Sequence, residues 1–311
     1  MTARIAILGF GLIGGSIARA LARLPEGQRP RVDAWSPSGE GPAMAVADGV
    51  LDGRLSEPGE AWASELVVLA APPLACLDLL DALAARRPSA GSTTTVTDVA
   101  STKARIVERA RALDLSFVGG HPMAGLEVTG YGAARADLFR DRPWVVVPGG
   151  LARPSDVDRV EELARSVGAR PIRMDPQGHD RAVAAISHLP LLTAVALVEA
   201  VVGGPGGLDR PGWPAARALA AGGWAGMTRL ASGDVEMGAG ILATNADATA
   251  AGLRDLRDAI DGWLAELERP GGPDAASLRS RLRAARERLV PQEPADDEGA
   301  AAGGDPGGDD A

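Results

Sequence analysis

The chain has 311 residues and a formal net charge of −9, with 46% hydrophobic and 23% charged residues. This length and composition are typical of a globular protein with room for two domains. The acidic balance is the opposite of the basic footprint that nucleic-acid binding requires, so no nucleic-acid partner is expected.

Short apolar runs alternate with helical patterns along the first half of the chain. Strands are expected at 4–8, 31–35, 65–73, 93–100, 144–149 and 170–174, with helices at 14–24, after residue 101 and at 155–167. This alternation predicts an α/β domain over 1–174, with a parallel sheet covered by helices on both faces.

The pattern changes after Met174. Apolar helical stretches follow at 179–202, 214–232 and 241–268, and a polar helix is expected at 274–290. Since no strand pattern remains, 175–290 is predicted to be an all-α domain. The last 21 residues, 291–311, hold seven Asp or Glu and no Lys or Arg. Without hydrophobic periodicity, they are expected to form a disordered acidic tail.

A glycine motif joins the first strand to the first helix. Gly9, Gly11 and Gly14 form G-x-G-x-x-G at the start of the alternating pattern. The first glycine permits a tight turn, the second lets the backbone approach a pyrophosphate, and the third lets helix and strand pack closely. In this context the motif predicts a Rossmann-type dinucleotide-binding domain. The cofactor-binding residues expected at the turn are Gly9, Gly11, Leu12, Ile13 and Gly14.

The choice between NAD and NADP depends on the end of the second strand. Ser36 stands where NAD sites usually place an acid that holds the ribose hydroxyls. A serine neither binds both hydroxyls well nor repels a 2′-phosphate, and no arginine follows it closely in the sequence. Both cofactors therefore remain open, with a slight preference for NADP tolerance. Ala71, Pro72 and Asp98, near the ends of two other strands, are also expected to contact the cofactor.

One of only three histidines lies in the segment GGHPMAGLEVTGYG, residues 119–132. The glycines and the proline around His121 disfavour a helix interior or a long strand, so a tight, irregular turn is expected. Such a turn presents a side chain at a fixed angle, which suits a residue with a chemical task.

Four stretches together resemble the prephenate and arogenate dehydrogenases of tyrosine biosynthesis: GFGLIGGS (9–16), TDVASTK (97–103), HPMAGLEVTGYG (121–132) and HDRAVAAISHLP (179–190). The resemblance runs from residue 4 to about residue 267. It implies a Rossmann-type domain followed by a helical domain that forms a homodimer. In the family reaction, the ring carbinol of prephenate is oxidised with a nicotinamide as hydride acceptor. The ring carboxylate leaves as CO2, which gives 4-hydroxyphenylpyruvate.

The resemblance implies two catalytic residues. His121 would accept the hydroxyl proton, because a neutral imidazole suits that transfer near neutral pH. Ser101 would bond the substrate hydroxyl and the catalytic histidine, although it also stands where the following helix needs an N-cap. His179 and Asp180 are interpreted as a pair at the start of a helix.

The substrate-binding residues follow from the same resemblance. Arg229 would hold a substrate carboxylate through two parallel hydrogen bonds. Ser187 and His188, in the SHLP segment, would line the substrate site, and Glu127 would lie near it. No metal is expected.

Three family positions in the helical half are altered. Leu191, Gly226 and Gly238 stand where the family often has a histidine, an aspartate and a tryptophan. The pocket is therefore expected to be larger and less polar, and arogenate or 4-amino-4-deoxyprephenate remain alternative substrates. The absence of an added acid mildly favours a keto acid.

Functions of other classes are less favoured. Another Rossmann reductase would usually rely on a lysine in its helical domain, and residues 175–268 contain none. A cofactor-binding regulatory protein without catalysis also remains an alternative.

The N-terminus and the cysteine content bear on location. MTARIAILGFG lacks the basic segment and the long apolar run of a signal peptide. No stretch has the ~20 uninterrupted apolar residues needed to cross a bilayer. Cys76, the single cysteine, lies in an apolar run and is expected in the core. These features predict a cytoplasmic protein without a membrane partner.

Overall fold

A computed structural model describes residues 2–88, 93–126, 128–204 and 209–289. Its contacts divide the chain into two compact units, 1–253 and 254–311. The expected acidic tail, 291–311, lies outside the described residues.

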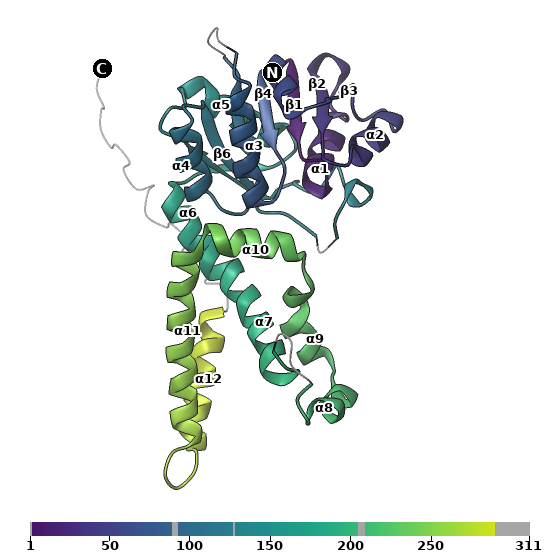
Figure 1. Cartoon of the computed structure of the whole chain (residues 1–311). Coiled ribbons are helices and arrows are strands. Elements are labelled where there is room, and N and C mark those ends of the chain that lie inside the picture. The colour runs from purple at the N-terminus through teal and green to yellow at the C-terminus, as the bar shows by residue number, and fades with distance from the viewer. Residues whose placement is uncertain (1, 89–92, 127, 205–208, 290–311) are drawn as a thin grey trace, which may run out of the picture. The chain divides into compact units, whose positions relative to one another are not determined.

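An eight-stranded sheet forms the centre of the first unit in the described part of the chain (Figure 1). The strands follow the order β3-β2-β1-β4-β5-β6-β7-β8. Their bounds are β1 Arg4–Leu8, β2 Arg31–Trp35, β3 Gly53–Arg54, β4 Leu66–Leu69, β5 Thr95–Asp98, β6 Phe117–Pro122, β7 Pro143–Pro148 and β8 Arg170–Arg173. All neighbouring pairs are parallel except β6–β7. The predicted parallel sheet is confirmed except at this pair, whose strands have no α-helix between them in the described residues.

Helices cover both faces of the sheet, as the alternation of β1 illustrates. Ile5 and Ile7 pack with α1 and α5, whereas Ala6 and Leu8 pack with α3 and α4. Successive strand residues point to opposite faces, so a strand that is buried on both sides is apolar throughout. The helices of this part are α1 Leu12–Leu21, α2 Glu40–Ala47, α3 Pro73–Ala85, α4 Ala104–Ala112 and α5 Pro154–Ser166. The predicted α/β class is confirmed.

Only helices follow β8 in the described residues. They are α6 Pro176–Val183, a π-helical turn Ala184–His188, α7 Leu189–Val201, α8 Trp213–Leu219, α9 Gly222–Thr228, a 3-10 turn Arg229–Ser232, α10 Val235–Thr244, α11 Ala246–Leu267 and α12 Ala275–Leu289. The predicted all-α character of this part is confirmed. The division into 1–174 and 175–290 stays a prediction, because residues up to 253 belong to the first compact unit.

Sequence patterns missed four elements: α2, α3, β3 and β6. The last of these contains the candidate catalytic histidine. His121 lies in β6 and pairs with Val145 of β7, so the expectation of an irregular turn is wrong. Neighbouring atoms occupy the space where Gly119 and Gly120 would carry side chains, so glycine fits at these two strand positions. A Cβ on Gly120 would lie 2.5 Å from the Asp98 carbonyl oxygen.

One helical stretch of the described residues, 176–201, is long and apolar enough to cross a bilayer by length and composition, with a mean hydropathy of 1.8. A helix that is buried in a soluble assembly passes the same test, so this finding is weak evidence for a membrane. In the single chain, only 22% of the most apolar window is buried. This stretch therefore leaves an apolar surface to be covered.

Candidate active site

The glycine turn after β1 has the geometry that a pyrophosphate requires. Gly9 has a φ of 91°, and a Cβ there would lie 2.4 Å from the carbonyl oxygen of Ala70. A Cβ on Gly14 would lie 2.6 Å from the carbonyl oxygen of Gly9. Beside Gly11 the space is open, since the nearest atom to an added Cβ is 3.9 Å away. The turn is thus closed on its protein side and open where a phosphate would approach the start of α1.

The remaining predicted cofactor residues have different surroundings. Leu12 and Ile13 form the first turn of α1, which has no acidic residue and no side-chain cap. Ala71 and Pro72 lie between β4 and α3 and are partly exposed. Asp98 is completely buried, and its carboxylate faces the interior. Asp98 has a structural role in this arrangement, and the cofactor contact expected of it stays a prediction.

A cavity of about 360 Å³ lies at the ends of β2 and β3. Ser36 lines it, and its Oγ accepts a hydrogen bond from the Gly39 backbone N–H at 3.2 Å. Arg54 also lines it, because the short β3 pairs with β2 and sets Arg54 beside Ala34. The sequence offered no nearby arginine, since Arg54 comes 18 positions after Ser36 and belongs to a strand too short to recognise.

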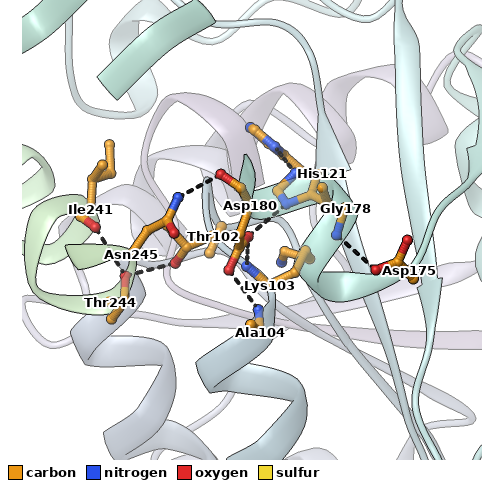
Figure 2. Close-up of polar contacts among 12 residues, drawn as sticks. Thr102, Lys103, Ala104, His121, Asp175, Gly178, Asp180, Ile241, Thr244 and Asn245 are labelled. Atoms are coloured by element: carbon orange, nitrogen blue, oxygen red, sulfur yellow. Dashed lines mark hydrogen bonds and ion pairs between the residues drawn. The ribbon is translucent and has the colours of Figure 1, made fainter. Parts of the chain in front are cut away.

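His121 belongs to a hydrogen-bonded group of histidines and a carboxylate (Figure 2). Its Nδ1 lies 2.8 Å from Nε2 of His179, and Nδ1 of His179 lies 2.8 Å from Oδ1 of Asp180. His179 and Asp180 are 1% and 4% exposed, whereas His121 is partly exposed. Burial holds the pKa of His121 well below its usual value, and a positive charge on His179, Lys103 or His188 lowers it further. Its imidazole is therefore neutral at neutral pH and able to accept a proton.

A buried ion pair holds the strand that carries His121. The Lys103 ammonium contacts Asp98 and donates to the carbonyl oxygen of Gly120 at 2.8 Å. Asp98 also accepts from the backbone N–H of Gly120 at 3.0 Å and from that of Ala100 at 3.1 Å. Gly120 immediately precedes His121, so these contacts fix the end of β6.

Ser101 follows β5 and is partly exposed. It is not the N-cap that the sequence suggested, because α4 begins at Ala104 with Lys103 at the cap position. Asp180 instead satisfies the start of α4, since its two carboxylate oxygens accept from the N–H groups of Lys103 at 2.7 Å and Ala104 at 2.9 Å. The interpretation of His179 and Asp180 as a helix start is also wrong. Asp175 caps α6 through the Gly178 N–H at 2.7 Å.

The π-helical turn separates two predicted substrate residues. Ser187 is exposed, whereas His188 is 1% exposed. The Asn245 side-chain amide donates to the Asp180 carbonyl oxygen at 2.8 Å and lies 3.2 Å from Nδ1 of His188. Nδ1 of His188 is therefore an acceptor, which leaves the proton on a buried Nε2 without a partner in the described structure. Single-turn π-helices are frequent at functional sites, and this one presents an unused donor.

The other predicted substrate residues are less defined. Arg229 is exposed at the start of the 3-10 turn, and its contact with a substrate carboxylate stays a prediction. Glu127 lies outside the described residues. Two altered positions meet, because a Cβ on Gly238 would lie 3.8 Å from Cδ2 of Leu191. The expected larger and less polar substrate pocket stays a prediction.

Sequence reasoning missed several side chains that assemble the site. They are Arg54, Lys103, Asn245 and the pair Thr102–Thr244, whose hydroxyls lie 2.7 Å apart. Thr102 and Lys103 lie in the TDVASTK motif (97–103), so the sequence contained a signal for these two. The others contact the site only after the chain folds.

Residues 17–173 match the family model described as prephenate dehydrogenase, nucleotide-binding domain, and residues 175–272 match prephenate dehydrogenase, dimerization domain. The chain is 32% identical over 272 residues to a prephenate dehydrogenase of Bacillus subtilis (strain 168), which covers 85% of this chain and 68% of the relative.

Solved structures agree with these matches. A Synechocystis arogenate dehydrogenase is 28% identical, with a TM-score of 0.74 over 92% of this chain and 100% of that chain. A prephenate dehydrogenase from A. aeolicus, solved with hydroxyphenyl propionate and NAD+, has a TM-score of 0.79 and 23% identity. It covers 93% of this chain and 99% of that chain, and at this identity it supports the fold alone.

Proposed function

Because the chain belongs to the prephenate dehydrogenase family, we propose that it oxidises and decarboxylates prephenate to 4-hydroxyphenylpyruvate with NAD or NADP. One observation carries this proposal. His121 lies at the carboxyl end of β6, and the glycine turn lies at the carboxyl end of β1. Strands β1, β4, β5 and β6 are mutually parallel neighbours, so both features are at the same edge of the sheet. Ligands of doubly wound sheets bind at this edge.

Each predicted site residue has a separate role in the proposed reaction. The bound nicotinamide supplies the hydride acceptor. The neutral imidazole of His121 accepts the hydroxyl proton, and Ser101 orients that hydroxyl. Arg229 binds a carboxylate of the substrate dianion, and Ser187 and His188 line the substrate site. Glu127, which lies outside the described residues, stays a predicted substrate residue.

The pocket at Ser36 supports NADP as an accepted cofactor. Ser36 carries no charge that would repel a 2′-phosphate, and Arg54 lines the same cavity. A guanidinium binds a phosphate through charge-assisted hydrogen bonds. We therefore propose that NADP binds at least as well as NAD, with the 2′-phosphate between these two side chains.

The first alternative substrate is arogenate, which is named for the Synechocystis relative; 4-amino-4-deoxyprephenate is the second. The apolar contact between Leu191 and Gly238 offers no acid for an ammonium group, which favours the keto acid prephenate.

An absorbance assay at the nicotinamide band tests the function. Prephenate, arogenate and 4-amino-4-deoxyprephenate are each offered with NAD and with NADP. We expect the highest kcat/KM with prephenate. A higher value with an amino substrate would reassign the specificity. Cofactor binding without turnover of any of the three would instead indicate a regulatory protein.

A homodimer and a cytoplasmic location complete the proposal. Residues 175–272 match a dimerization-domain model, and the same region has apolar side chains exposed in the single chain, including Leu219, Met227 and Val235. A second copy of the chain would cover them. In the cytoplasm the buried thiol of Cys76 would stay reduced.

A further inference from the structure

Two buried side chains behind His121 have no assigned task in the proposed reaction. His179 and Asp180 belong to α6, and they are connected in series to His121 by two contacts of 2.8 Å. Figure 2 labels His121 and Asp180, the two ends of this series. Each ring nitrogen of His179 has a different partner. The Asp180 carboxylate can only accept, so it determines the direction of both hydrogen bonds.

The hydrogen bond between Asp180 and His179 has one possible direction. Its two oxygens accept the backbone N–H groups of Lys103 and Ala104, which are the first groups of α4. The positive end of the helix dipole favours an anion here, and a carboxylate has only acceptors to offer. Nδ1 of His179 must therefore carry the proton that it shares with Oδ1 of Asp180.

The direction of the hydrogen bond between His179 and His121 follows from the first. A neutral His179 with its proton on Nδ1 has only a lone pair on Nε2. Nδ1 of His121 must donate to that lone pair, and the second nitrogen of His121 remains bare. Nε2 of His121 has no partner among the described residues, so it is available to the substrate.

We propose that His179 and Asp180 are positioning residues that hold His121 in the tautomer with the proton on Nδ1 and a bare Nε2. This inference rests on the proposed function. During turnover the O–H bond of the substrate breaks, its electron pair stays on oxygen, and an N–H bond forms at Nε2. The cation that forms on His121 then donates through His179 toward the Asp180 carboxylate.

The charged groups around His121 explain why its tautomer has to be held. Burial opposes a positive charge on His121, and a charged His179, Lys103 or His188 opposes it further. The ammonium of Lys103 is itself paired with Asp98, and Asp180 is the carboxylate hydrogen-bonded in series with the ring. A cationic His179 would donate from both nitrogens, place the proton of His121 on Nε2, and disable the base.

Nitrogen NMR of protein labelled with 15N-histidine tests the tautomer directly, because the chain has only three histidines. We expect His121 and His179 to be protonated on Nδ1 and His188 on Nε2 near neutral pH. His121→Gln, His179→Gln and His188→Gln assign the signals. A His121 protonated on Nε2, or a cationic His179, overturns the inference. Because this measurement needs no substrate, it stands even if prephenate is not turned over.

Kinetics of His179→Asn and Asp180→Asn provide the second test. We expect kcat to fall about 10- to 100-fold, the usual effect of losing an outer partner of a working histidine. The KM values for substrate and cofactor should change less than about twofold, because neither residue contacts them. In both variants the His121 signals should show a mixture of tautomers.

Asp175→Asn is the matched control. Asp175 caps the same helix through Gly178. Its carbonyl oxygen accepts the backbone N–H of His179 at 3.0 Å, which the substitution keeps, and its side chain has no bond to the histidine rings in the described structure. This variant should keep kcat and the His121 tautomer. If it lowers kcat as much as Asp180→Asn does, or if His179→Asn keeps full kcat, a general stabilising role of α6 replaces the proposed one.

Discussion

His121 combines a neutral ring, a fixed backbone and one open nitrogen. The strand β6 and the Lys103–Asp98 pair hold its backbone, and His179 occupies Nδ1. Nε2 is therefore the ring nitrogen of His121 that can accept a proton from the substrate. A pKa lowered by burial keeps this nitrogen unprotonated at neutral pH.

His121→Asn removes the proton acceptor and keeps a polar side chain of similar size. We expect kcat to fall by a factor on the order of 10²–10⁴. The Kd of the cofactor should stay within about twofold, because the glycine turn is untouched. Steady-state rates and a fluorescence titration with NADPH measure the two quantities. Normal turnover would remove the role assigned to His121.

Burial lowers the pKa of His188 from 6.5 to about 4. The unfolded chain therefore binds one more proton between these values, and the free energy of unfolding falls as pH decreases from about 6.5 to about 4. The loss assigned to His188 is on the order of 2–3 kcal/mol. Urea unfolding of the wild type and of His188→Gln at a series of pH values should give a shallower slope for the variant. Equal slopes would contradict the burial effect.

The 2′-phosphate proposal depends on Arg54. Arg54→Ala should raise KM for NADP about 10- to 100-fold, since a hydrogen bond to a charged group contributes about 1.5–3 kcal/mol. KM for NAD should hardly change. Ser36→Asp should shift preference toward NAD by repelling the phosphate and binding the ribose. Equal effects of Arg54→Ala on both cofactors would show that the arginine does not reach the phosphate.

At the scale of elements, the turn between β1 and α1 shows how adjacent glycines differ. Gly14 packs against backbone, whereas Gly11 borders open space. The sequence motif contains both glycines, and only the packing around them separates a structural task from a binding task.

Gly11→Ala and Gly14→Ala form a matched pair. Gly11→Ala should keep the melting temperature but weaken cofactor binding about tenfold or more, equivalent to about 1.4 kcal/mol. Gly14→Ala places a Cβ 2.6 Å from the carbonyl oxygen of Gly9 and should destabilise the fold by about 1–3 kcal/mol. Thermal unfolding and isothermal titration with NADP distinguish the two effects. Unchanged affinity in folded Gly11→Ala would place the pyrophosphate elsewhere.

At the scale of the whole molecule, the helical part leaves apolar side chains uncovered. Leu219 is 83% exposed and Val235 is 79% exposed. Scattered single side chains of this kind are ordinary on a surface. Together with the apolar stretch 176–201, however, they indicate a surface that is covered by a partner.

Sedimentation should give twice the chain mass of 31.7 kDa. A double variant, Leu219→Glu with Val235→Glu, should weaken self-association, because burying two carboxylates in an interface is costly. Met44→Glu, at a residue of α2 that is 52% exposed, is the control and should leave the dimer intact. A wild-type mass of one chain, or equal effects of the variant and the control, would contradict this interface.

The sequence by itself determined the architecture and the chemistry available to the chain. The run at 5–8 specifies a strand that is apolar on both faces, and the glycine motif specifies a turn that only small residues permit. These patterns are local in the sequence, so they can be recognised without knowledge of the tertiary structure. The short β3 carries too few residues for a periodic pattern, and β6 was hidden because its glycines are individually poor strand formers.

Only the tertiary structure decided which side chains share the site. It buried Asp98 beside Lys103, set Arg54 in the cavity of Ser36, and joined His121 to His179 and through it to Asp180. Each of these contacts joins side chains from different elements or depends on how a neighbouring element packs. Their distances are set by strand order and helix packing, which no local pattern encodes.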